Sequence, residues 1–239
     1  MTFVTFVPAT AMPYTQHESD ERVVLEPATP ATAAVIWLHG LGADGFDFVP
    51  VAGELKLPAA LSVRFIFPHA RPRPVTINNG YVMRAWYDIK QLGGGSRIED
   101  DAGIRESAQV VNGYIEQQNA AGIATDRIVI AGFSQGGAIA LHAALRCPQR
   151  LAGVLALSTY LPLQATVAAE AAPANRDVPI LFCHGTYDQV VPAAMGGASR
   201  DVLQRLGYAV QWRTYPMEHS VSQQEIVDIS AWLQERLGK

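Results

Sequence analysis

The stretch Ile130–Ala138, "IAGFSQGGA", places Ser134 between Gly132 and Gly136, with an apolar run before it and an Ala-rich run after it. A serine at the apex of a tight turn from strand to helix takes a strained backbone conformation. The residues two before and two after it then come too close for side chains, so glycine is needed at both places. The pattern predicts a nucleophilic serine presented at the carboxyl edge of a sheet.

The regions around this stretch alternate between short apolar runs and amphipathic patterns. Nearly continuous apolar runs are typical of parallel strands covered on both faces, and we expect strands at Ala33–Gly40, Val63–Pro68, Arg127–Gly132, Ala152–Ser158, Val178–Gly185 and Val210–Tyr215. A helix is expected from Asp101 onward, and a last helix after the capping-box pattern of Ser222 and Glu225. This alternation predicts a mostly parallel, doubly wound α/β sheet with helices on both faces.

Composition indicates a globular enzyme or binding protein that does not need disulfides or a metal for its stability. The chain has 239 residues, of which 49% are hydrophobic and 17% charged. We expect one domain over residues 23–239 and an N-terminal extension over residues 1–22 that is either part of this domain or poorly ordered. A net charge of −4 without a long basic run argues against nucleic-acid binding. Cys147 and Cys183 are expected to be buried thiols.

The sequence shows no pattern of export or membrane insertion. The first 22 residues lack a basic region followed by a long apolar one, so no signal peptide is expected. The most apolar span, around Ile128–Leu145, is interrupted by polar residues and glycines, so no stable membrane insertion is expected. A cytoplasmic location is predicted.

A serine nucleophile needs a base, and the base needs an orienting acid. In this fold the chain order is serine, acid, histidine. His219 follows the last predicted strand and is the expected base, whereas His184 ends a strand and is expected to support the turn there. Asp188, in the loop after the penultimate strand, is the expected acid, although an isolated loop aspartate is often only a solvated turn residue.

Two backbone N–H groups are expected to hold the oxyanion: that of Gln135 at a helix N-terminus and that of Leu41 in the glycine-rich loop "LHGLGADGFDF". Glycine-rich loops also bind phosphates, but this one lacks the spacing of nucleotide-binding motifs. His39 has no partner at metal-ligand spacing, so a hydrogen-bonded structural role is expected for it. Neither a metal nor a cofactor is predicted.

Residues 68–100 contain several prolines, the run Asn78–Gly80, the run Gly93–Gly95 and a group of aromatic residues. A loop of this length inside a compact domain is usually functional or contains small elements of its own. Two interpretations are open. The segment either covers a sheet edge or forms a wall or flap beside the active site.

Five blocks, "WLHGLGADGFDF", "FPHARPRPVTINNGYVMRAWYDI", "GFSQGGAIAL", "FCHGTYDQVVP" and "YPMEHSVSQQEI", resemble the bacterial carboxylesterase branch of the acyl-protein thioesterase/lysophospholipase family of α/β-hydrolases. The resemblance implies an α/β-hydrolase fold, Ser134, Asp188 and His219 as the triad, and Leu41 and Gln135 as oxyanion donors. Apolar side chains of residues 75–92 and of the run Tyr160–Leu163 are expected to shape the acyl pocket. The individual substrate-binding residues expected are Met83, Trp86, Tyr160, Leu161 and Val190. A homodimer is one expected state of assembly.

The predicted function is hydrolysis of short- to medium-chain carboxylic esters, and also of thioesters, through an acyl-enzyme. The partner expected is a small ester or acyl-thioester. The first alternative is an acyl-protein thioesterase or a lysophospholipase, which keeps the chemistry and changes the substrate. The second is a binding module that uses the same fold without turnover.

Overall fold

The computed structural model describes residues 14–58, 60–90 and 99–238. Within them an eight-stranded sheet has the order β1-β2-β4-β3-β7-β8-β9-β10. The strands are β1 (Tyr14–Glu18), β2 (Arg22–Pro27), β3 (Ala33–Leu38), β4 (Val63–Pro68), β7 (Ile128–Phe133), β8 (Gly153–Leu157), β9 (Ile180–Gly185) and β10 (Val210–Tyr215). From β4 to β10 the strands run parallel to one another, whereas β2 pairs antiparallel with both β4 and the edge strand β1.

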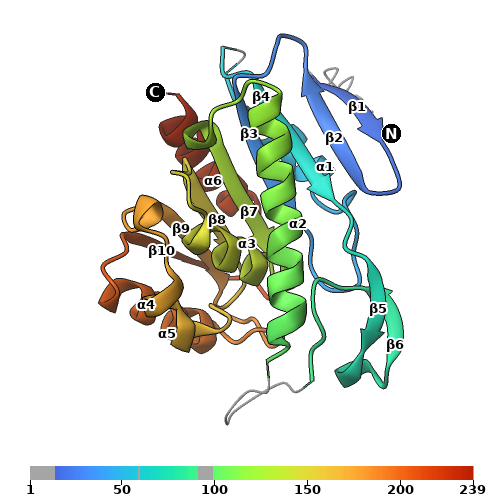
Figure 1. Ribbon diagram of the computed structural model, residues 1–239, viewed down its shortest axis with the longest axis vertical. Helices are drawn as coiled ribbons and strands as arrows, with labels where there is room; N and C mark the ends of the chain where they lie inside the picture. Colours follow the sequence, from blue (N-terminus) through green and yellow to red (C-terminus); the bar gives the residue numbers. More distant parts are fainter. Residues whose placement is uncertain (1–13, 59, 91–98, 239) are drawn as a thin grey trace, which may run out of the picture.

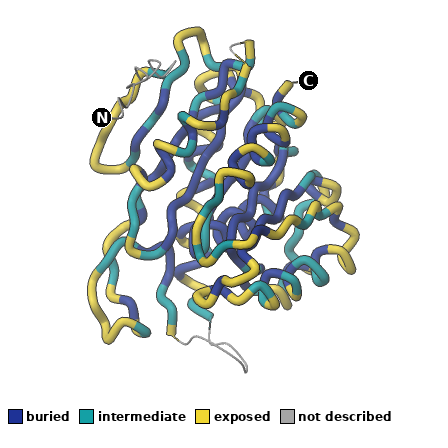
Figure 2. The backbone as a smooth tube through the Cα atoms, turned by 180° about the vertical axis from the view of Figure 1, so that it is seen from behind, coloured by how far each residue is buried: buried dark blue, intermediate teal, exposed yellow. Residues whose placement is uncertain are grey.

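Helices cover both faces of the sheet (Figure 1). They are α1 (Val49–Glu54), α2 (Asp101–Ala120), α3 (Gln135–Arg146), α4 (Val167–Glu170), α5 (Ala193–Arg205) and α6 (Gln223–Leu237). Successive residues of a strand point to opposite faces, so Ile130 belongs to the core beneath α2, α3 and α5, whereas Val129 belongs to the core beneath α1 and α6. The central strands are accordingly buried along their whole length (Figure 2).

The predicted strands and helices are confirmed, with ends that differ by up to two residues. In α2 the apolar residues Ile104, Ala108, Val111 and Ile115, which recur at helical spacing, are buried. The capping box at the start of α6 is present, with Ser222 accepting from the Glu225 amide and Glu225 accepting in return. The predicted and observed elements agree because the spacing of apolar residues differs between helices and strands and can be read within each short segment.

Two parts of the chain form antiparallel pairings whose strands are absent from those predicted. Tyr14–Glu18 pairs with β2 and becomes the sheet edge, whereas residues 1–13 of the expected extension lie outside the described residues. Residues 68–100 contain a hairpin of β5 (Pro72–Val75) and β6 (Tyr81–Arg84), and an isolated bridge between Ile89 and Glu99. The glycine run at residues 93–95 lies outside the described residues. Both parts are antiparallel pairings, which sequence periodicity signals weakly when a strand is short or exposed.

Candidate active site

Ser134 stands alone between the end of β7 and the start of α3, with φ of 54° and ψ of −119°. This positive φ is uncommon for a residue with a side chain and marks local strain. A Cβ at Gly132 would lie 2.3 Å from the Gly136 carbonyl oxygen, and one at Gly136 would lie 2.4 Å from that of Leu38. The two glycines are therefore required by close backbone approach, as the sequence predicted.

The turn is held from both sides. The Ser134 amide donates to the Leu157 carbonyl at 2.9 Å, and the Thr159 hydroxyl donates to the Ser134 carbonyl at 2.6 Å. Both partners belong to β8 or to the residues that directly follow it. The strained turn is thus fastened to the neighbouring strand, which keeps the serine at the carboxyl edge of the sheet.

Asp188 and His219 meet at this same edge. Asp188 follows β9 and His219 follows β10, and Oδ2 of Asp188 lies 2.6 Å from Nδ1 of His219. The other carboxylate oxygen, Oδ1, accepts from the amides of Val190 and Val191 at 2.9 and 2.8 Å. An acceptor at Nδ1 places the ring proton there and leaves Nε2 free of a proton when the imidazole is neutral.

The His219 ring packs against Phe133, the residue before Ser134. Its centroid lies 4.6 Å from that of Phe133. The loop that carries it is tied to the Asp188 loop, because the Tyr187 amide donates to the Met217 carbonyl at 3.0 Å. The structure therefore brings the regions of all three predicted triad residues to one rim of the sheet.

His184 is the other histidine that the sequence offered as a base. It is fully buried, and Nε2 lies 2.8 Å from the Val191 carbonyl oxygen and 3.6 Å from Oδ2 of Asp188. Burial lowers the pKa of His184, which favours the neutral ring as a donor to that carbonyl. His184 thus supports the turn that carries Asp188, as expected.

A cavity of about 230 Å³ opens beside Ser134. Most of the surface area of its wall is apolar. The residues that line it are Leu41, Ile77, Asn78, Tyr87, Asp88, Ile89, Lys90, Glu99, Asp100, Ser134, Gln135, Tyr160, Val190 and Val191. The hydroxyls of Tyr87 and Tyr160 lie 2.7 Å apart and join two walls of it. The segment after β6 therefore forms a wall beside Ser134, as one interpretation of residues 68–100 expected.

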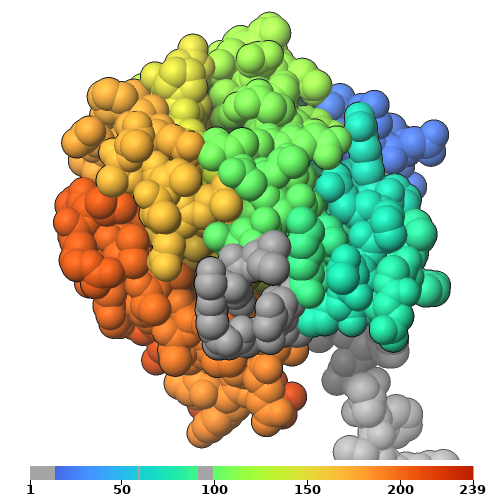
Figure 3. Space-filling view, turned by 60° about the horizontal axis from the view of Figure 1, so that its bottom comes forward, coloured from blue at the N-terminus to red at the C-terminus, as the bar shows by residue number. Residues whose placement is uncertain are grey.

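This cavity belongs to the face where the carboxyl ends of the strands meet. In Figure 3 the β5–β6 hairpin lies on one side of that face, and the segments that follow β8 and β9 lie on the other. Ligands of open α/β sheets bind outside the carboxyl ends of the strands. The cavity lies at this ligand-binding position.

The five residues expected to shape the acyl pocket divide into two groups. Tyr160 and Val190 line the cavity, whereas Met83, Trp86 and Leu161 do not. Trp86 is 2% exposed because its indole turns inward and donates to the His39 carbonyl at 2.9 Å. Leu161 is buried, with its amide bonded to the Ser199 hydroxyl of α5.

Met83 lies on β6, where its sulfur accepts from the Asn78 side chain at 3.4 Å. Ile77, Tyr87 and Ile89 also line the cavity, and they belong to residues 75–92, whose apolar side chains were expected to shape it, although they were not singled out. Their only signal was membership of an apolar and aromatic segment. That signal could not say which side of the segment would face Ser134.

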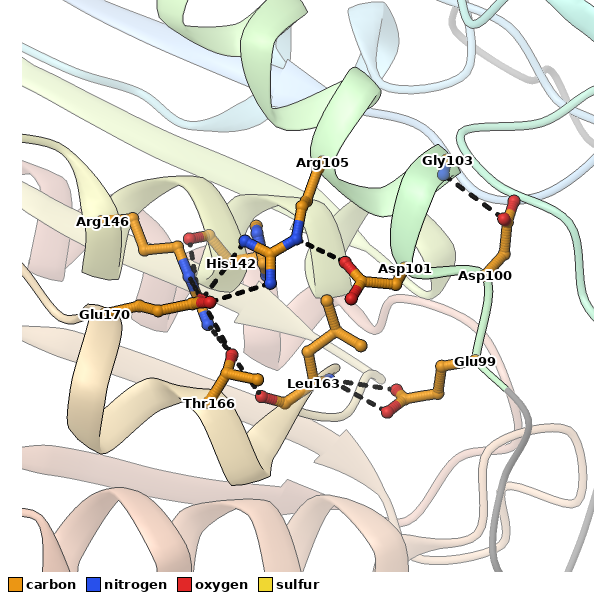
Figure 4. A network of polar contacts seen from close by, with 10 residues as sticks. All are labelled: Glu99, Asp100, Asp101, Gly103, Arg105, His142, Arg146, Leu163, Thr166 and Glu170. Carbon is orange, nitrogen blue, oxygen red and sulfur yellow. Dashed lines mark hydrogen bonds and ion pairs between the residues drawn. The ribbon is translucent and has the colours of Figure 1, made fainter.

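The cavity wall after β8 is anchored to two helices (Figure 4). Glu170 of α4 accepts from Arg105 of α2 at 2.8 Å and from Arg146 of α3 at 2.7 Å. The bond from Arg105, together with that from Arg146, lowers the pKa of Glu170 to about 2. Nearby, the Leu163 amide donates to the Glu99 carboxylate at 3.1 Å. This network fixes the excursion that contains Tyr160.

His39 has the structural role that the sequence predicted. Its Nδ1 lies 2.7 Å from the Gly40 carbonyl oxygen, so Nδ1 carries the proton, and Nε2 accepts from the Ala70 amide at 3.0 Å. Burial is the main cause that lowers the pKa of His39 to about 4.

Cys147 and Cys183 are buried free thiols. Across residues 14–58, 60–90 and 99–238, no helix is both long and apolar enough to span a membrane.

A mostly parallel sheet, with a strained serine between strand and helix and a carboxylate–histidine pair on later loops, defines the α/β-hydrolase class. SOBER1 of Arabidopsis thaliana shares this fold, with a TM-score of 0.82 and 32% identity over 86% of this chain and 99% of its own. Acyl-protein thioesterase 2 of Zea mays has a TM-score of 0.81 and 29% identity over 94% of this chain and all of its own.

The chain belongs to the phospholipase/carboxylesterase family, whose model matches residues 19–237. It is 40% identical to acyl-protein thioesterase 1 of Gibberella zeae over 90% of this chain and 95% of that protein. It is 42% identical to acyl-protein thioesterase 1 of Neurospora crassa over 87% of this chain and 88% of that protein. The predicted family is confirmed, but the prediction of its bacterial branch is not supported, because these relatives are fungal proteins.

Proposed function

We propose that this hydrolase cleaves acyl esters and acyl thioesters with Ser134 as nucleophile, His219 as base and Asp188 as orienting acid. The observation that carries the proposal is the 2.6 Å bond between Asp188 and His219, on loops that adjoin the strained turn of Ser134. A buried carboxylate held by two amides cannot turn away from the imidazole. It therefore holds the tautomer in which Nε2 accepts a proton.

In the proposed reaction His219 Nε2 removes the Ser134 proton as Oγ attacks the acyl carbonyl carbon. The resulting tetrahedral oxyanion collapses, the bond to the leaving alcohol or thiol breaks, and the leaving group takes the proton from His219. Water then attacks the acyl-enzyme, with His219 again removing and returning a proton. The products are a carboxylic acid and free Ser134.

The proposed oxyanion donors are the backbone amides of Leu41 and Gln135. Both residues line the cavity together with Ser134. Gln135 is the first residue of α3, where the amides have no partner within the helix and the helix dipole favours negative charge. Preorganised donors of this kind stabilise the transition state more than the ground state.

For the substrate class, we favour S-acylated proteins or peptides over the small carboxylic esters expected from the sequence. The fungal relatives at 40% and 42% identity are named acyl-protein thioesterase 1. The largely apolar cavity wall also suits an acyl chain. Lysophospholipids would present the same acyl group on a different leaving group and form the next candidate.

The test compares p-nitrophenyl esters of increasing chain length with an S-acylated cysteine peptide, using wild-type protein and Ser134→Ala. Ser134→Ala should lower turnover by about 10⁶ while keeping the fold. Efficient cleavage of the thioester, with activity kept beyond C10, supports the thioesterase. A sharp fall beyond short chains together with a poor thioester rate would favour a small-ester enzyme.

The non-catalytic alternative has its own test. A binding module would release no burst of p-nitrophenol and would not be labelled at Ser134 by a fluorophosphonate. Either a burst or labelling excludes it. The cytoplasmic location and the homodimer stay predictions.

A further inference from the structure

We propose that Trp86 and the side chain of Gln135 are positioning residues that together fix the two oxyanion donors, a role that rests on the function proposed above. Trp86 was expected to contact substrate, but it does not line the cavity. It lies instead behind the cavity wall, between the loop after β3 and the start of α3.

The first connection is made by the Gln135 side chain, which is buried at 3% exposure. Its Oε1 accepts from the Trp86 amide at 2.8 Å, and its Nε2 donates to the Tyr87 carbonyl at 2.7 Å. Both ends of the side-chain amide are therefore bonded to one short stretch of backbone. This fastens the residue that supplies one oxyanion N–H to residues 86–87.

The second connection reaches the loop of the other donor. The Trp86 indole donates to the His39 carbonyl at 2.9 Å, and the Arg84 carbonyl accepts from the Gly42 amide at 2.9 Å. These two bonds lie on either side of Leu41 in the chain. The stretch from residue 84 to residue 87 thus holds the Leu41 loop at two points, as it holds Gln135 at two points.

Trp86 itself has little freedom to shift. Its amide is bonded to Gln135 of α3, its carbonyl accepts from Ser107 of α2, and its indole is bonded to His39. Its ring centroid lies 5.3 Å from that of His39. All three polar groups of Trp86 are therefore bonded to different parts of the fold, so it acts as a common support for both donor loops.

Donor placement matters because an oxyanion site works only when its N–H groups already point at the developing charge. A displacement of about 1 Å can lower a rate on the order of 100-fold. Loosening this support should consequently impair the step that forms the oxyanion. Because the Gln135 side chain is buried and its lost bonds are to backbone groups, the loss of rate should be similar for short and long acyl chains.

Gln135→Met and Trp86→Phe test the proposal. Methionine keeps the size of the glutamine and the backbone N–H but makes neither side-chain hydrogen bond, and phenylalanine removes the indole donor. The matched controls are Gln118→Met, a buried glutamine of α2, and Trp232→Phe, a buried tryptophan of α6 whose indole N–H has no partner among the described residues.

We expect kcat of each test variant to fall about 10- to 100-fold with KM nearly unchanged, because the lost stabilisation is specific to the transition state. The loss should be equal for C4 and C10 esters. Inhibition by a trifluoromethyl ketone, which forms a tetrahedral oxyanion on the serine, should weaken by a similar factor. The controls should lower the melting temperature comparably without affecting kcat.

The proposal is overturned if kcat of the test variants equals that of their controls, if the loss depends on chain length, or if ketone inhibition is unchanged. If Trp86→Phe fails to fold, the Gln135→Met variant alone tests the proposal, because it removes two hydrogen bonds and hardly changes the volume of the side chain. Failure of the proposed function would look different. Wild-type protein would then be inactive, or Ser134→Ala would keep its activity.

Discussion

Asp188 and His219, 31 positions apart in the chain, share a hydrogen bond of 2.6 Å at the carboxyl edge of the sheet. The carboxylate is 5% exposed and also accepts from two backbone amides of its own loop. A carboxylate with both oxygens engaged holds one orientation. It can therefore select the tautomer of the imidazole instead of merely neutralising its charge.

Asp188→Asn should lower kcat by about 10⁴, because an amide N–H facing Nδ1 favours the wrong tautomer of His219. The measurement is hydrolysis of a p-nitrophenyl ester, with circular dichroism to check the fold. Asp177→Asn is the control, since Asp177 is an exposed aspartate paired with Arg150. An Asp188→Asn variant that kept more than a tenth of the activity would remove Asp188 from the triad.

Gly132→Ala should destabilise the fold by about 1–3 kcal/mol or more, because its Cβ would lie 2.3 Å from the Gly136 carbonyl oxygen. Gly113→Ala in α2 is the matched control. A Cβ there meets no atom within 4 Å, so alanine should add up to about 1 kcal/mol of stability. Urea unfolding measures both. Equal stability of the two variants would contradict the close approach at the turn.

Glu225 should make stability depend on pH. It is fully buried, and burial raises its pKa to about 8. Between the ordinary pKa of glutamate and pH 8, the unfolded chain is ionised while the folded chain still holds the proton. Folding then takes up a proton, so the free energy of unfolding falls as pH rises through this range.

Glu225→Gln should remove this dependence, since glutamine does not ionise and still satisfies the capping box. Relative to the variant, the wild type should lose on the order of a few kcal/mol between pH 5 and 8. Urea unfolding of both proteins at pH 5, 6.5 and 8 provides the comparison. Parallel pH curves would show that Glu225 ionises alike in both states.

Tyr160→Ala should open the cavity at the wall where Tyr160 meets Tyr87. We expect the ratio of kcat/KM for a C12 ester to that for a C4 ester to rise about ten-fold, the scale of one or two methylenes in an apolar pocket. Tyr81→Ala is the control, because Tyr81 is 69% exposed on β6 and does not line the cavity. An unchanged ratio would mean that Tyr160 does not limit the acyl chain.

The residues proposed for chemistry were identifiable because each stands at a position that the fold makes special. Ser134 is surrounded by the glycines that its turn needs, and Asp188 and His219 lie in the loops that follow two predicted strands. Strand ends predict which side chains share an edge. Such positions can be inferred without knowledge of contacts.

The pocket was harder to predict. Trp86 and Tyr87 are adjacent aromatic residues in one segment, yet Trp86 turns inward to support the loops while Tyr87 faces the cavity. Nothing in their residue types separates them. The difference follows from the indole donor finding the His39 carbonyl, a partner 47 positions away.

The sequence by itself indicated the succession of strands and helices along the chain, the strained serine and the residues proposed as acid and base, because these depend on local periodicity and on spacing along the chain. The tertiary structure alone decided the antiparallel edge, the cavity lining and the hydrogen bonds that join residues 84–87 to Gln135 and to the loop of Leu41. These depend on hydrogen bonds and packing between segments far apart in sequence, and only the folded backbone brings those segments together.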